Sequence, residues 1–424
     1  MTGPTPPHPP RHKGEISVTE LLSKASRNML EVWGEEMFRN SGTVLEVLGQ
    51  RLMIFNRPAA IEAVLVTQAE SFAAKPAQLS KLLAPLMGEG LFIAEGARWR
   101  TRRPLAAGAM AGVTSGLAAV IGAWEADWAA RPEGTVLELI GAMEQVSAEI
   151  LLRLIFGPAG DRRAAAQIAP LAHAYRDKIS GAGLITLMAL PEPLVRLRLN
   201  GDAKRIRAVV DPLLIRARQA GTGLVASLPA EGLREEAISL FAMGHDALSG
   251  MLAAAWFLLA EAPEVEAALH AELDAAPALT PEHLPLTRAV LLEALRLYPP
   301  VPLFGRVASR ATEVAGLAVP KASLAFIAPW LVHRHVDYWE APDEFRPTRF
   351  LPDAPPPAPF TFLPFGLGPR HCVGEAFTLQ AGTLALASLA RRFRLAAIPG
   401  QRAAPTAGLT LSLAPRLNMR LTRR

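Results

Sequence analysis

Apolar residues recur at helical spacing along most of this chain of 424 residues. The stretch from 116 to about 220 reads as helical, with breaks at Pro132, Gly157-Pro158 and Pro191-Glu192-Pro193. Four more helical stretches are expected, over residues 233–260, 265–273, 281–297 and 373–394. The pattern therefore predicts a chain dominated by helices.

Short strands are expected between these helices. A hairpin is predicted over residues 45–55, turning at Gly49-Gln50, with a helix from about Pro58. Strand patterns follow over 312–319, 323–329, 409–413 and 417–421. Because helices and strands do not alternate in βαβ order, we predict a mainly α protein with small β-sheets.

The N-terminus differs in composition from the rest of the chain. Its prolines indicate a flexible arm over residues 1–14, followed by a single domain over 15–424; they are Pro4, Pro6, Pro7, Pro9 and Pro10. The first forty residues contain no apolar run long enough for a signal peptide or a membrane span. We therefore expect a cytoplasmic protein without a transmembrane anchor.

Charge adds one constraint on partners. The formal net charge is +5, and half of the residues are apolar, which suffices for a large core. The arginines do not form one run with aromatic residues between them, so we expect no nucleic-acid partner. Two arginine clusters stand out, at 98–103 and 391–394.

Cys372 is the only cysteine, and it lies in a Gly-rich loop just before a predicted helix. A free thiol has a pKa of about 8.5, and we expect the amides and dipole of the helix N-terminus to lower it. The alternatives are a buried structural cysteine or a zinc ligand, although zinc takes at least three protein ligands and no second cysteine exists. Haem iron needs only one protein sulfur.

The segment Phe365-x-x-Gly368-x-Arg370-x-Cys372-x-Gly374 resembles the haem-binding signature of the cytochrome P450 family. This resemblance implies the P450 fold and a haem b (iron protoporphyrin IX) cofactor with Cys372 as the axial ligand of its iron. It also implies O2 as co-substrate and contacts of Phe365, Arg370 and Gly374 with the haem.

Two further segments resemble structural motifs of that family. Glu293 and Arg296 lie three residues apart on one helix face, and Arg349 lies in a Pro-broken stretch downstream. The resemblance implies that the three form a buried triad that stabilises the fold, since a buried charge is tolerated only when it is paired. Alone, a Glu-x-x-Arg pair is equally typical of a solvated helix surface.

Upstream, Trp99 and Arg103 resemble the Trp-x-x-x-Arg helix of the family. They share one helix face, so an indole N–H and a guanidinium can point at the same carboxylate. By resemblance these carboxylates are the haem propionates, with Arg306 and Arg370 as further partners. The alternative for each arginine is an ordinary solvated charge.

On the oxygen side, Gly244 and Asp246 match the family's Gly-x-Asp/Glu-Thr motif, but Ala247 stands where the family has threonine. In the family that hydroxyl assists oxygen activation and proton delivery, so we expect a water or a substrate hydroxyl to replace it beside Asp246. Ser249 lies about 200° further around the helix and is expected to face away. The alternative for Asp246 is a pair with a distal arginine, and His245 is expected to form a hydrogen bond on the helix face.

The resemblance implies a haem-thiolate monooxygenase that hydroxylates a lipophilic small molecule, with Leu303, Phe304, Met243 and residues 184–190 as pocket candidates. Electrons are expected from an acidic ferredoxin or flavodoxin with its NAD(P)H reductase, docked on a positive face that includes Arg98 and Arg102. Ala247 also suits a peroxygenase, or an isomerase or dehydratase that does not activate oxygen. A haem sensor and a nucleic-acid binder are weaker alternatives.

Overall fold

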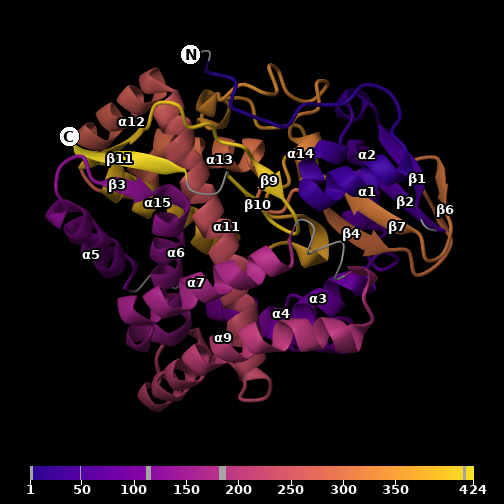
Figure 1. The fold of residues 1–424 in the computed structure, drawn as a ribbon, viewed down its shortest axis with the longest axis horizontal. Helices are drawn as coiled ribbons and strands as arrows, with labels where there is room; N and C mark the ends of the chain where they lie inside the picture. Colours follow the sequence, from indigo (N-terminus) through magenta and orange to yellow (C-terminus); the bar gives the residue numbers. More distant parts are fainter. Residues whose placement is uncertain (1–2, 48, 111–115, 181–187, 414–416) are drawn as a thin grey trace.

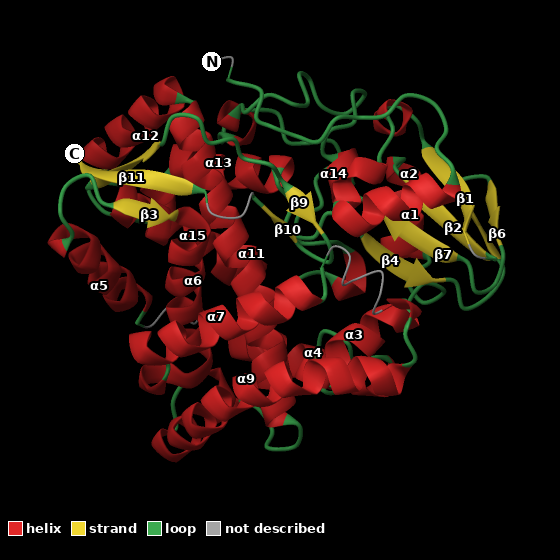
Figure 2. Ribbon diagram, viewed as in Figure 1, coloured by secondary structure: helices red, strands yellow, loops and turns green. Residues whose placement is uncertain are grey.

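The structure, a computed structural model, describes residues 3–47, 49–110, 116–180, 188–413 and 417–424. Helices form most of these residues, and strands gather into small sheets at opposite sides of the molecule (Figure 2). This confirms the predicted mainly α class with small β-sheets.

Each predicted helical stretch contains at least one helix, and further helices, among them residues 77–87, lie outside those stretches. In the first half they are α1 (Val18–Arg27), α2 (Pro58–Glu62), α3 (Ala77–Met87), α4 (Gly96–Met110), α5 (Leu117–Ala130), α6 (Leu139–Phe156) and α7 (Arg162–Lys178). In the second half they are α9 (Glu192–Ala220), α10 (Leu224–Ser227), α11 (Leu233–Glu261), α12 (Pro263–Ala275), α13 (Pro285–Leu297), α14 (Pro329–Val332) and α15 (Glu375–Ala390).

The largest sheet has the strand order β1-β2-β7-β4, built from β1 (Gly42–Val47), β2 (Gln50–Phe55), β7 (Leu324–Ile327) and β4 (Phe304–Val307). A second sheet has the order β3-β11-β8, from β3 (Val136–Glu138), β11 (Asn418–Arg423) and β8 (Phe393–Ala397). Two strand pairs complete the set: β5 (Thr312–Val314) with β6 (Leu317–Val319), and β9 (Thr406–Ala407) with β10 (Leu411–Ser412). In Figure 1 the largest sheet lies at one side of the helices, and β3 and β11 lie at the other.

Two predicted elements differ from the sequence prediction in kind as well as in their ends. The single strand predicted over 312–319 is a tight hairpin, because Ala315 and Gly316 both adopt positive φ angles, of 49° and 85°. The helix predicted over 373–394 ends at Ala390, and Phe393 begins β8, which pairs with β11 at the C-terminus. A partner strand this far away in the sequence is invisible to local periodicity.

Helix α11 forms the centre of the core (Figure 1). It packs against α6 and α13, and its Trp256 lies 6.0 Å, centroid to centroid, from Trp128 of α5. Among the described helices it alone is long and apolar enough to cross a bilayer, and 61% of its most apolar window is buried inside the protein. An all-round apolar helix that is covered in this way is a core helix.

The N-terminal arm lies against the body of the molecule from residue 3 onward. The carbonyl of Pro4 accepts a hydrogen bond from the Phe345 amide (3.0 Å), and the carbonyl of Pro7 accepts one from the buried Tyr298 hydroxyl (2.9 Å). Arg11 lies 2.6 Å from Asp343, whose carboxylate is also 3.4 Å from the buried Arg334. The flexibility of residues 1–14 stays a prediction, and these contacts give the arm a defined resting place.

Candidate functional site

The loop around Cys372 folds back on itself before α15. The Cys372 amide donates to the Phe365 carbonyl (2.9 Å), and the Gly374 amide donates to the Cys372 sulfur (3.3 Å). These two bonds fix the sulfur relative to the loop backbone. A hydrogen bond from an amide favours the anionic form of a sulfur.

Gly368 is required by this loop on two counts. Its φ angle is +68°, in the left-handed region, and a Cβ there would lie 1.8 Å from the Leu65 carbonyl oxygen. Close approach to the segment that follows α2 thus sets the path of the loop toward Cys372.

The pKa of Cys372 departs from our expectation. Surrounding atoms desolvate the sulfur, and this burial raises the pKa of the thiol, although the Gly374 amide and the Arg103 charge lower it. The side chain still has solvent-accessible surface, because a sulfur can be reached from one direction and enclosed from the others. Helix α15 begins at Glu375, three residues after Cys372, so its N-terminus lies further from the sulfur than predicted and lowers the thiol pKa less. A bound cation is the remaining way to make the sulfur an anion.

Three basic side chains crowd together near this loop: Lys75, Arg306 of β4 and Arg370. Burial, followed by the charges of Arg370 and Arg306, lowers the pKa of Lys75 to about 7. Burial, followed by the Arg370 charge, likewise lowers the pKa of Arg306 to about 10. Among the residues that the structure describes, no carboxylate forms an ion pair with any of the three, and Glu95 is the acid whose charge acts on all of them.

Partly buried cations that repel one another are stabilised by an anion between them. Haem carries two propionates, and its iron takes one thiolate. The cluster and the Cys372 sulfur therefore fit both ends of that cofactor. Lys75 was missed by the sequence reasoning, because it belongs to no motif and its partners come from β4 and the Cys372 loop.

Trp99 and Arg370 lie together. The Arg370 guanidinium carbon is 4.2 Å from the centroid of the Trp99 ring, and its Nη1 donates to the Ala94 carbonyl (2.8 Å). This stacking contributes about 0.5–1 kcal/mol and holds Arg370 beside α4. Arg103 lies one turn beyond Trp99 on α4, close enough to Cys372 for their charges to interact.

The structure brings Glu293, Arg296 and Arg349 together. Arg296 Nε and Nη2 donate to the two carboxylate oxygens of Glu293, at 2.7 and 2.8 Å, and Arg349 Nε lies 3.3 Å from the same carboxylate. Glu293 and Arg296 are fully buried. Arg296 Nη1 also donates to the carbonyls of His333 and Pro342, which ties α13 to the segment before Arg349.

The oxygen-side residues lie along α11 with different neighbours. Gly244 faces α6, because a Cβ there would lie 3.0 Å from a methyl group of Leu151. His245 is fully buried, with Nε2 3.1 Å from the Glu144 carbonyl oxygen, and Ser249 donates to the His245 carbonyl (2.7 Å). Ala247 is partly buried and brings no polar group.

Asp246 pairs with Arg176 of α7, whose Nη1 lies 3.4 Å from its carboxylate. The alternative that we left open, a pair with a distal arginine, is thus observed. Arg176, Glu144 and His173 form a wider network that the sequence reasoning missed. A basic residue in the last turn of an amphipathic helix gives no local sign of its partners.

The arginine surface predicted for Arg98 and Arg102 needs correction. Arg98 pairs with Glu89, and Arg102 donates to the Glu89 carbonyl (2.8 Å) and lies 3.6 Å from Glu236. Both charges are therefore compensated locally. Arg100 is exposed on α4 and forms no ion pair with the described residues.

Replacing Glu293 by Gln is expected to destabilise the protein by about 3–5 kcal/mol, because it leaves the buried Arg296 without a counter-charge. The measurement is the free energy of unfolding in urea, followed by tryptophan fluorescence. Glu344→Gln is the matched control, since its partner Arg346 is more exposed, and is expected to cost less than about 1 kcal/mol. Equal losses in the two variants would contradict a structural role for the Glu293 charge.

Known proteins match this chain both in sequence and in fold. The family model described as Cytochrome P450 matches residues 194–422. A solved crystal structure of a cytochrome P450 (CYP102L1) superposes with a TM-score of 0.79 at 23% identity, covering 99% of this chain and 100% of that one. This shows that the fold is the P450 fold.

Curated relatives carry oxygenase names. Cyclooctatin synthase of Streptomyces melanosporofaciens is 31% identical over 360 residues, covering 78% of each chain. Cyclooctat-9-en-7-ol 5-monooxygenase of the same organism is 29% identical, covering 74% of each chain. Pentalenene oxygenase of Streptomyces avermitilis is 31% identical, covering 57% of this chain and 60% of its own. The chain belongs to the cytochrome P450 family and is a monooxygenase of that family.

Proposed function

We propose that Cys372 is the axial ligand of a haem b iron and that the enzyme hydroxylates an apolar substrate. When bound, the haem activates O2, so that one oxygen atom enters the substrate and the other leaves as water, with two electrons and two protons consumed. The observation that carries this proposal is a sulfur fixed by two hydrogen bonds and desolvated by its surroundings, together with a cluster of partly buried cations that lack ion-pair carboxylates among the described residues.

The cations take the two propionates in this proposal. Arg103, Arg306 and Arg370 hold these carboxylates, as the family resemblance implies, and Lys75 joins them. Trp99 keeps Arg370 in place by stacking. Phe365 holds the Cys372 amide, and Gly374 donates to the sulfur, so both keep the ligand in one orientation.

Glu293, Arg296 and Arg349 have a structural role in this account. The Glu293 carboxylate also accepts from the Arg346 amide (2.8 Å), so one charge fixes α13, Arg349 and the segment between them. Fixing this framework limits movement of the loop that carries Cys372.

On the oxygen side, Asp246 is proposed to move protons toward the reacting centre. Gly244 lets α11 pack closely on α6, and Ala247 leaves that side of the helix without a hydroxyl. Ser249 does not replace it, because its hydroxyl is bound to the His245 carbonyl within the helix. A water or a hydroxyl group of the substrate therefore completes the proton path.

The substrate is proposed to be lipophilic. Met243, Leu303 and Phe304 are partly buried apolar residues that pack against the cores, and of the predicted segment 184–190 residues 184–187 lie outside the described residues. Pentalenene and cyclooctat-9-en-7-ol, named in the relatives, are the first compounds to test. The test is a shift of the haem absorption from low spin to high spin on titration.

Ala247 specifically favours one alternative, a peroxygenase, and leaves room for an isomerase or dehydratase that does not use O2. We expect product with O2, a ferredoxin and its NAD(P)H reductase, and much less product with hydrogen peroxide alone. Product formation is measured by mass spectrometry with ¹⁸O2, which labels the product only if O2 supplies the oxygen. Unlabelled product formed equally well with peroxide alone would establish the peroxygenase.

Electrons are proposed to come from an acidic ferredoxin or flavodoxin that docks beside α4. The exposed Arg100 is the candidate contact on this helix, in place of Arg98 and Arg102. A cytoplasmic setting is proposed as well, since a lone cysteine suits a reducing compartment.

Replacing Arg100 by Glu is expected to slow reduction of the enzyme by the partner about 5- to 10-fold at low salt, because charge complementarity mainly raises the association rate. The measurement is stopped-flow reduction at increasing partner concentration. Arg216→Glu, the same charge change on an exposed residue of α9, is the control and should leave the rate unchanged. An identical loss in both variants would argue against a docking site on α4.

A further inference from the structure

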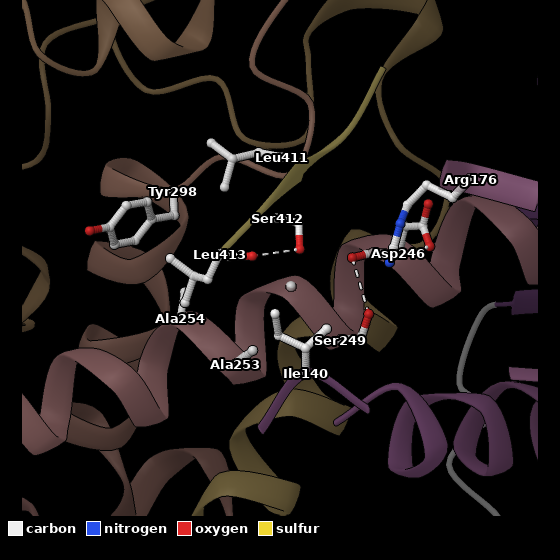
Figure 3. A pocket seen from close by; sticks show the side chains of 11 residues that line it. Ile140, Arg176, Asp246, Ser249, Ala253, Ala254, Tyr298, Leu411, Ser412 and Leu413 are labelled. Carbon is white, nitrogen blue, oxygen red and sulfur yellow. Dashed lines mark hydrogen bonds and ion pairs between the residues drawn. The ribbon is translucent and has the colours of Figure 1, made fainter. Parts of the chain in front are cut away.

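The carboxylate of Asp246 is faced by groups from three segments. Arg176 of α7 and His245 of α11 each lie 3.4 Å from Oδ1, and the Thr410 hydroxyl lies 3.5 Å from Oδ2. Figure 3 shows the Arg176 guanidinium lying against this carboxylate at the edge of a small pocket. Of these three groups, Arg176 alone also contacts a second buried acid, Glu144, so a change near Glu144 can move Arg176 away from Asp246.

Arg176 is shared by three acids: a single nitrogen serves two of them, and its Nε lies 3.9 Å from the third, Asp177. Its Nη1 lies 2.9 Å from Oε1 of Glu144 on α6 and 3.4 Å from Oδ1 of Asp246 on α11. Glu144 is buried, and its shorter distance makes it the stronger competitor. The ion pair between Arg176 and Asp246 therefore depends on whether another cation neutralises Glu144.

His173 is the second group positioned to neutralise Glu144. Its Nδ1 lies 2.9 Å from Oε1 of Glu144 and 2.6 Å from Nη2 of Arg176, and its Nε2 lies 3.1 Å from Asp177. A ring nitrogen either donates a proton or accepts one. Nδ1 thus donates to Glu144 when it is protonated, or accepts from Arg176 when it is not.

A carboxylate lies against each ring nitrogen, so a doubly protonated ring donates to both, and the 2.6 Å contact between Nδ1 and Arg176 Nη2 is then one between two donors. Hydrogen bonds with Asp177 and with Glu144 raise the pKa of His173 to about 10, against the opposing effects of burial and of Arg176. Helix α6, which packs on α7, contributes Glu144, and α11 reaches Arg176 through the Asp246 side chain, with His245 beside it. On α9, Asp202 pairs instead with Lys178.

We propose that His173 is a positioning residue for Asp246: as an imidazolium it neutralises Glu144 and leaves Arg176 to hold the Asp246 carboxylate. The chain of contacts runs from the exposed Asp177 and the partly exposed His173 to the distal side of α11. The inference rests on the proton role proposed for Asp246. It adds residues of α6 and α7 that no motif of the family marks.

The test uses a charge-removing substitution and its rescue. In His173→Gln, Glu144 keeps its charge without the imidazolium, so Arg176 moves fully onto Glu144. A crystal structure of the variant should then show Arg176 more than about 4 Å from the Asp246 carboxylate, beyond ion-pair distance. The yield of product per NAD(P)H consumed should fall about fivefold, the effect of losing one such hydrogen bond.

Adding Glu144→Gln to His173→Gln removes the competing charge. The double variant should return Arg176 to Asp246 and restore the product yield. His283→Gln, at an exposed site, is the control and should change neither measurement. A role for His173 in stability alone predicts that the second substitution adds to the damage, because another buried contact is lost.

Two outcomes would overturn the inference: Arg176 remaining within ion-pair distance of Asp246 in His173→Gln, or no recovery of the yield in the double variant. Failure of the proposed haem ligation and substrate hydroxylation would look different. It would abolish O2-dependent product in the unaltered enzyme, while the crystallographic distances would still test the role of His173.

Discussion

The energetic cost of ionising one desolvated sulfur governs this site. Burial raises the pKa of Cys372, and the same kind of burial lowers the pKa of Lys75 and Arg306, so desolvation disfavours the charged form of all three groups. Iron would supply the cation that the sulfur lacks, and propionates would supply the anions that the basic cluster lacks. In our proposal, one cofactor therefore stabilises both the thiolate, through its iron, and the basic cluster, through its propionates.

Charge compensation also organises the protein beyond the cofactor site. Glu293 is shared by Arg296 and Arg349, Arg176 is shared by Glu144 and Asp246, and Asp343 is shared by Arg11 and Arg334. Each shared group joins segments that are distant in the sequence. Removing one member of such a group leaves a partner without compensation, which costs more than the loss of one surface pair.

Sequence reasoning succeeded where the chemistry is local. The Phe365–Gly374 loop and the Glu293–Arg296 pair have fixed short spacings, and the family that they resemble is confirmed. The direction of the Cys372 pKa was wrong, because desolvation comes from packing that no local motif encodes. Lys75 and Arg176 were missed for a related reason: their partners come from other elements and meet them only in the folded chain.

Helices were likewise predicted better than strands, because helices depend on local sequence and strands on distant partners. Helix α11 was predicted almost to its ends, since apolar residues recur along it at helical spacing and its second half, from Met251 to Ala260, is apolar throughout. Strands β4 and β8 were missed, because each exists only through pairing with a strand elsewhere, β7 and β11 respectively. Local periodicity therefore defined the helices, whereas the small sheets and the buried charges required the tertiary structure.

The most direct test of the account is the carbon monoxide difference spectrum of the reduced, haem-loaded protein. We predict the red-shifted Soret band that is diagnostic of a thiolate ligand, and its loss in Cys372→Ser, where an alcohol oxygen replaces the sulfur. A spectrum without that band in the unaltered protein, or the same band in the Ser variant, would contradict ligation of haem iron by Cys372.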